Sequence, residues 1–234
     1  QKDPGDVIDV LKLNLVRDFQ TGIYDYNTMV SLFVESSDFS LVKQTFTSAE
    51  WCGHVYEDLV FGPKATGARV FSYFEDESFD GKITLPKGGV TEEQFLVLVR
   101  GLRGPYLQPG EKREVPFLPG TLRRRLAHRP LAWNTARIQR LENPETVTVI
   151  AGTFPSDVYV VHTATGRKGV FHVERAEPHR VVRWSWDQAK EGASAPFETA
   201  ERAELAGTTR LPYWKLHREG HERYLADMGL PAGK

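Results

Sequence analysis

The chain has 234 residues, of which 40% are hydrophobic and 11% aromatic, and its formal net charge is −1. This composition can fill a substantial core and excludes a disordered chain, which would combine low hydrophobicity with high net charge. No apolar run of about 18 residues is present, so no transmembrane helix is predicted, and the single Cys52 excludes an internal disulfide and a multi-cysteine zinc site.

The first third of the chain alternates polar and apolar residues, as half-buried strands do. Leu11, Leu13 and Leu15 alternate with polar residues. The same pattern, with many β-branched and aromatic residues, predicts β-structure at residues 11–15, 19–33, 42–47, 55–61 and 69–74. Turns are predicted at Thr21-Gly22 and Asp80-Gly81, and a loose end at residues 1–5.

One amphipathic helix is predicted at Thr91–Arg103. Thr91 can cap its N-terminus, and Gln94, three residues later, completes a capping box. Helical spacing places four apolar residues on one face: Phe95, Leu98, Val99 and Leu102. Gly104-Pro105 ends the helix, and the basic stretch that follows at residues 122–142 is ambiguous between strand and helix.

An antiparallel meander is predicted over Glu145–Trp186. Its strands are expected at residues 146–149, 158–162, 170–174 and 181–186, with breaks at residues 151–155, 165–167 and Pro178. A polar loop at 190–196, a last strand near 202–205 and a short C-terminal helix at about 217–228, ending at Gly229, complete the chain.

These elements predict a mainly β fold with a single domain over residues 1–234 and a possible internal boundary near residues 105–119. We expect a strongly curved antiparallel sheet or partly open β-barrel, with one packed helix and a short C-terminal helix, because curling hides the sheet edges. The expected core residues are Leu13, Phe46, Trp184, Trp186 and either Val170 or Phe171.

Charge is distributed unevenly. Residues 50–80 hold seven acids against Lys64 and Arg69, whereas residues 100–140 hold ten lysines and arginines against two acids, a net charge of +8. Such a segment either forms a solvated face, is neutralised by the acidic region, or docks on an acidic partner. The docking hypothesis expects accessible side chains at Arg113, Arg123, Arg124, Arg125 and Arg129. Interleaved aromatics are missing, so no nucleic acid is expected.

The most unusual local stretch is Glu50-Trp51-Cys52-Gly53-His54. Cys52 and His54 could form a nucleophile or half of a metal site. The simpler interpretation places Trp51 in the core and makes Cys52 a small buried hydrophobe, whose replacement by serine would cost on the order of 1–3 kcal/mol. The pairs His217/His221 and His172/His179 are further candidate metal ligands. A surface helix explains the first pair as well, and a polar cluster with Glu174 and Glu177 explains the second.

Two blocks of motifs resemble families of exported bacterial envelope proteins. Leu11–Asn14, Thr21–Tyr26 and Glu50–Tyr56 are similar to predicted lipoproteins, some of which are labelled septum formation inhibitor. Ala151–Phe154 and the dipeptides Arg183-Trp184, Glu204-Leu205 and Tyr213-Trp214 are similar to a broader exported β-rich family. The resemblance implies a periplasmic or envelope location and a membrane-associated protein. It implies no catalytic residues, and this chain departs from the lipoproteins in lacking an anchor cysteine near its start.

The sequence therefore predicts a non-catalytic protein that needs no cofactor or metal. It would serve as an accessory subunit of a membrane-associated assembly or bind an apolar ligand. The acidic face of a membrane protein complex and anionic lipid headgroups are the expected partners of the basic segment. The alternative is a Cys/His-dependent hydrolase or metal-binding enzyme built on Cys52 and His54.

Overall fold

The computed structural model describes residues 7–188 and 198–231. The predicted loose end at 1–5 and the predicted loop at 190–196 lie outside these residues. Contacts divide the chain into two compact units: unit 1 comprises residues 1–104 and 114–136, and unit 2 comprises residues 105–113 and 137–234. The first division, after Gly104, falls at the start of the stretch that the sequence marks as a possible boundary.

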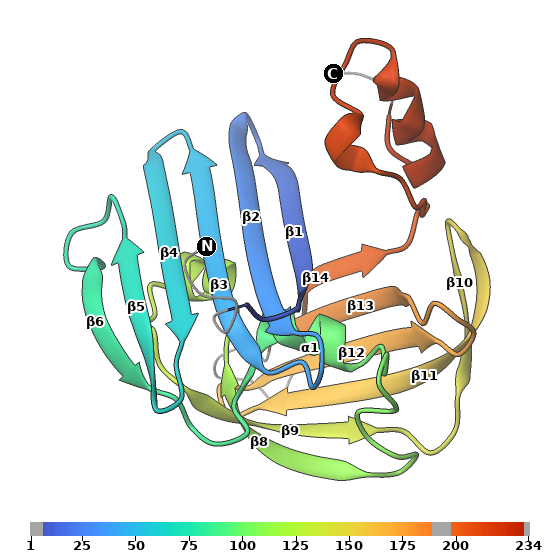
Figure 1. The fold of residues 1–234 in the computed structure, drawn as a ribbon, viewed down its shortest axis with the longest axis horizontal. Helices are drawn as coiled ribbons and strands as arrows, with labels where there is room; N and C mark the ends of the chain where they lie inside the picture. The colour runs from blue at the N-terminus through green and yellow to red at the C-terminus, as the bar shows by residue number, and fades with distance from the viewer. Residues whose placement is uncertain (1–6, 189–197, 232–234) are drawn as a thin grey trace. The chain divides into compact units, whose positions relative to one another are not determined.

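Unit 1 is built on a six-stranded antiparallel sheet whose strands pair in chain order (Figure 1). The strands are β1 (Val10–Thr21), β2 (Tyr24–Glu35), β3 (Leu41–Glu50), β4 (Gly53–Phe61), β5 (Ala65–Phe71) and β6 (Phe79–Thr84). The remaining elements of the unit are β7 (Val90–Thr91), α1 (Glu92–Leu98), most of β8 (Lys112–Leu118), α2 (Thr121–Leu126) and the start of β9 (Asn134–Arg140).

The two faces of the six-stranded sheet differ. On the inner face, Leu32 and Val34 pack with Phe39 and with Val97 of α1, so the predicted helix does lie against the sheet. On the outer face, directly paired residues form an exposed, largely apolar row across five strands, and paired residues of an antiparallel sheet share one face. This outer row consists of Val16, Met29, Thr47, Tyr56 and Phe71.

Unit 2 contains a second meander: β10 (Glu145–Val149), β11 (Gly152–Thr163), β12 (Arg167–Glu174), β13 (Val181–Gln188) and β14 (Glu198–Glu204). The sheet to which it belongs has the order β14-β13-β12-β11-β9-β8-β7, with β10 also paired to β11, and is curled as a half-barrel. Two short 3-10 helices follow, η2 (Tyr213–Lys215) and η3 (His221–Met228). The mainly β prediction is thus confirmed.

A close approach of two strands organises the core of unit 2. Gly169 of β12 pairs directly with Trp186 of β13. A Cβ at Gly169 would lie 2.8 Å from the Trp186 ring, so only glycine leaves room for the indole. Phe171 contacts the same ring edge-to-face, with centroids 5.6 Å apart, and Arg167 lies over it at 4.2 Å. Of the expected core residues, Phe46, Phe171 and Trp186 are buried, while Leu13, Val170 and Trp184 are half-buried.

Several predicted strand boundaries are wrong at positions where proline or glycine predicts the end of a strand. Asp80-Gly81 lies inside β6, paired with β5, and the expected connection at 105–119 contains β8. Pro155 lies within β11, and the pairing of β11 with β12 begins one residue later, at Ser156. Because no β12 residue pairs with Pro155, its missing N–H removes no hydrogen bond between these two strands. The capping box of α1 is confirmed, although the helix ends at Leu98 rather than near Arg103.

Candidate functional site

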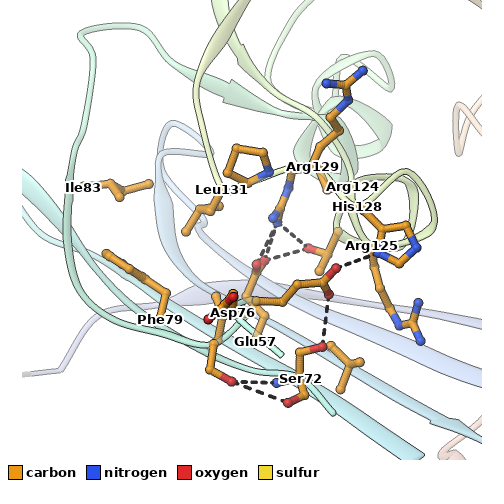
Figure 2. A pocket seen from close by; sticks show the side chains of 16 residues that line it. Glu57, Ser72, Asp76, Phe79, Ile83, Arg124, Arg125, His128, Arg129 and Leu131 are labelled. Carbon is orange, nitrogen blue, oxygen red and sulfur yellow. Dashed lines mark hydrogen bonds and ion pairs between the residues drawn. The ribbon is translucent and has the colours of Figure 1, made fainter. Parts of the chain in front are cut away.

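A pocket of about 480 Å³ lies in unit 1 between the strands β4–β6 and the segment that begins with α2 (Figure 2). Its apolar walls come from both sides. The strands supply Val55, Val70, Phe79 and Ile83, and the segment after α2 supplies Pro130 and Leu131. Charged residues also line it, and their pairing decides what the pocket can do.

The base of the pocket holds a buried ion pair. The Nη2 atom of Arg124 donates to both carboxylate oxygens of Glu57, at 2.8 and 2.7 Å, and the two side chains are only 7% and 1% exposed. Thr121 donates to the same carboxylate at 2.6 Å, and the Nε of Arg124 donates to the Pro119 carbonyl at 3.1 Å. Glu57 is therefore fully compensated, and α2 is fastened to β4.

A second ion pair joins α2 to the end of β3. Arg125 bonds to Glu50 and donates to the Tyr73 hydroxyl at 2.5 Å. Its guanidinium lies over the rings of Tyr73 and Phe74, at 5.1 and 5.2 Å. Burial raises the pKa of Tyr73, and the charge of Arg125 opposes that shift. The Nε of Arg125 is buried and has no hydrogen-bond partner among the described residues.

The third pair is more exposed. His128 Nδ1 lies 2.6 Å from a carboxylate oxygen of Glu77, and the Ser72 hydroxyl donates to the other oxygen at 3.1 Å. Figure 2 shows this group together with the pair formed by Glu57 and Arg124. Most charges that line the pocket are thus matched by a neighbour, which favours binding of a largely uncharged molecule.

The basic segment does not present all of its arginines as expected. Arg124 and Arg125 are buried, not accessible, because acids of the 50–80 region pair with them. Arg123 is half-buried, and Arg129 is exposed. Arg113, in unit 2, pairs with Glu111 at 2.8 Å and is 46% exposed. Docking through the remaining arginines stays a prediction.

The stretch Glu50–His54 forms the tight connection between β3 and β4. Trp51 and Cys52 are exposed, so the expectation of a buried Trp51 and Cys52 is wrong. The backbone N–H of Cys52 donates to the Tyr24 hydroxyl at 2.8 Å. Gly53 has φ +149°, and a Cβ there would lie 2.9 Å from the Tyr73 ring, so this turn requires glycine. His54 is exposed, and neither it nor Cys52 lines the pocket.

Replacing Cys52 with serine is now expected to change the free energy of unfolding by less than about 0.5 kcal/mol, because an exposed side chain loses little packing. Urea unfolding of both proteins measures the difference. A thiol reagent should also label Cys52 in the native protein nearly as fast as in urea. A loss above about 1 kcal/mol, or protection of the native thiol, would contradict the exposed position.

A cluster of buried acids at the start of α1 was not predicted from the sequence. Glu93 is 4% exposed and accepts a hydrogen bond from Gln44 at 3.2 Å. Glu92 is 8% exposed and accepts from the backbone N–H of Gly120 at 3.0 Å. Burial, and then the charge of Glu92, raises the pKa of Glu93 to about 7. From the sequence alone, two adjacent glutamates after a helix cap are expected to face solvent. No local signal indicates that α2 begins beside them.

The candidate ligand histidines make local contacts instead. His172 lies 3.3 Å from Glu145, and His179 lies 3.2 Å from the carbonyl of Glu174. His217 contacts the Trp214 carbonyl at 3.2 Å. In residues 7–188 and 198–231, no three histidine, cysteine, aspartate or glutamate side chains are grouped so that they could hold a metal ion.

Within the same residues, no helix combines the length and the apolar character needed to cross a membrane. Comparisons with protein-family models, with curated proteins and with solved structures find no match to this chain.

Proposed function

We propose that this protein is a non-catalytic binding protein of the cell envelope that holds an apolar small molecule in the unit 1 pocket. The observation that carries the proposal is the pocket itself, with its volume of about 480 Å³ and its apolar walls. Small-molecule sites commonly have volumes of about 300–1,000 Å³, apolar walls and a few placed polar groups. The envelope setting is part of the proposal, and its only support is the resemblance of short sequence motifs to exported proteins.

The charged residues that line the pocket further limit the class of ligand that it can bind. Glu57 and Glu77 are already bonded to Arg124 and His128, so a charged ligand could contact them only by breaking an existing pair. Arg125 also lines the pocket, and its charge is paired with Glu50. The other two charged residues at the wall, Asp76 and Arg129, are exposed to solvent. A mainly apolar molecule fits the apolar walls best.

Filling the pocket tests the proposal. N-Phenyl-1-naphthylamine, an apolar dye that brightens when bound, should bind the native protein at a single saturable site. Val70→Trp places an indole among the lining residues and should weaken binding at least about tenfold, because one buried aromatic displaces most of a ligand of this size. The matched control is Val60→Trp, since Val60 is 50% exposed and lies one strand away outside the pocket.

The expected control result is unchanged affinity in Val60→Trp. Equal affinity in native protein and Val70→Trp would overturn the assignment of this pocket. Absence of saturable binding by the native protein would overturn the proposal that it holds an apolar molecule.

A further inference from the structure

The last part of unit 2 is a closed loop that carries little buried surface. It leaves β14 and contains η2 and η3, and neither helix has a buried residue. Its ends meet: a Cβ at Gly207 would lie 2.6 Å from the backbone of Met228, and one at Gly229 would lie 2.9 Å from Ala206. Figure 1 shows it, in red, beyond the end of β14. Local contacts thus hold the loop together while its side chains remain available.

Nine residues of this loop, Arg210–Arg218, combine exposed aromatic rings with three cations, although Glu219, Glu222 and Asp227 follow in the same loop. We call them the aromatic–basic segment. Tyr213 and Trp214 are 67% and 65% exposed, with their rings 5.5 Å apart and edge-to-face. The segment contains three permanent cations and no acid: Arg210, Lys215 and Arg218. Among the described residues, none of the three takes part in an ion pair.

This combination fits the surface of a lipid bilayer. Tryptophan and tyrosine favour the membrane–water boundary, because the ring is apolar and one edge stays hydrated. Lysine and arginine nearby are attracted to anionic headgroups. Leu211 and Leu216 of the same segment are half-buried and add some aliphatic surface. This composition suits the acyl boundary of a bilayer better than the stacked bases of a nucleic acid.

We propose that the aromatic–basic segment docks on anionic lipid bilayers. Tyr213 and Trp214 insert at headgroup depth, and Arg210, Lys215 and Arg218 contact lipid phosphates. One short segment with three charges gives weak, reversible, salt-sensitive binding rather than anchoring. The inference does not depend on the pocket, since no residue of the segment lines it.

Vesicle sedimentation of the full chain tests this proposal. The protein should bind vesicles of phosphatidylcholine with about one third phosphatidylglycerol, bind pure phosphatidylcholine much less, and release as salt increases. Trp214→Ala, and separately the triple variant Arg210→Ala, Lys215→Ala, Arg218→Ala, should each weaken binding at least about tenfold.

Two variants serve as matched controls. Trp51→Ala removes another tryptophan that is 65% exposed, and the triple variant Lys64→Ala, Lys82→Ala, Lys87→Ala removes three exposed cations elsewhere. Both should bind as the native protein does. The proposal is overturned if the native chain does not bind anionic vesicles, if the two segment variants bind normally, or if the controls lose binding equally.

Discussion

Replacing Arg124 with methionine is expected to lower the free energy of unfolding by about 3–5 kcal/mol, the usual cost of removing one partner of a buried ion pair. Glu57, whose side chain is 1% exposed, would keep its charge but lose its main donor. Thr121 would remain as a single hydrogen bond to that carboxylate. Urea unfolding measures the effect, and Arg129→Met is the control because Arg129 is exposed.

A second variant separates the lost pair from lost packing. The double variant Glu57→Gln, Arg124→Met leaves no unpaired charge at this site, so most of the lost stability should return. A loss below about 1 kcal/mol in Arg124→Met would show that the pair is hydrated in solution.

The free energy of unfolding of the native protein is expected to fall as pH rises from 5 to 8, because Glu93 becomes ionised in a buried position. In Glu93→Gln this part of the pH dependence should disappear. The folded pKa of Glu93 is about 7, above its ordinary value of 4.5. Between these values the folded protein retains a proton that the unfolded chain has released. The contribution of protonated Glu93 to stability is therefore fully present below pH 4.5 and is lost as pH rises through 7. A shift of this size corresponds to roughly 3 kcal/mol.

The measurement is urea unfolding at pH 5 and pH 8, with the difference between native protein and Glu93→Gln as the readout, because other groups titrate equally in both. The groups facing Glu93 are Glu92 on α1, Arg17 on β1 and Arg124 on α2. Glu75→Gln, at an exposed position, should follow the native pH dependence. An identical slope in Glu93→Gln would mean that Glu93 stays ionised across this range.

The fold was largely predictable because its signals are local. Alternation over Leu11–Leu15 and the capping box of Thr91 and Gln94 each act within a few residues, and both are confirmed. The wrong predictions concern residues whose type is compatible with two different local structures. Gly81 suits a turn, yet its pairing with Ala68 keeps it in β6. Trp51 suits a core, but it lies in a connection too tight to turn inward.

The site was less predictable, because its pairs join residues that are distant in the chain. Arg124 and Glu57 are 67 positions apart in the chain, so their ion pair forms between distant elements of the fold and not along one helix. The sequence showed complementary charge in two segments and allowed internal pairing as one explanation, but it could not choose the partners. The pocket itself depends on where α2 lies over β4–β6, which no motif encodes.

Intermolecular nuclear Overhauser effects between a bound apolar dye and methyl groups of the protein test the binding proposal most directly. The proposal predicts contacts from N-phenyl-1-naphthylamine to the methyl groups of Val55, Val70, Ile83 and Leu131, which line the pocket. It predicts none to Val16 or Met29, which lie in the exposed outer row. Contacts confined to that row, with no contact to the pocket methyls, would contradict the proposal that this pocket holds the ligand.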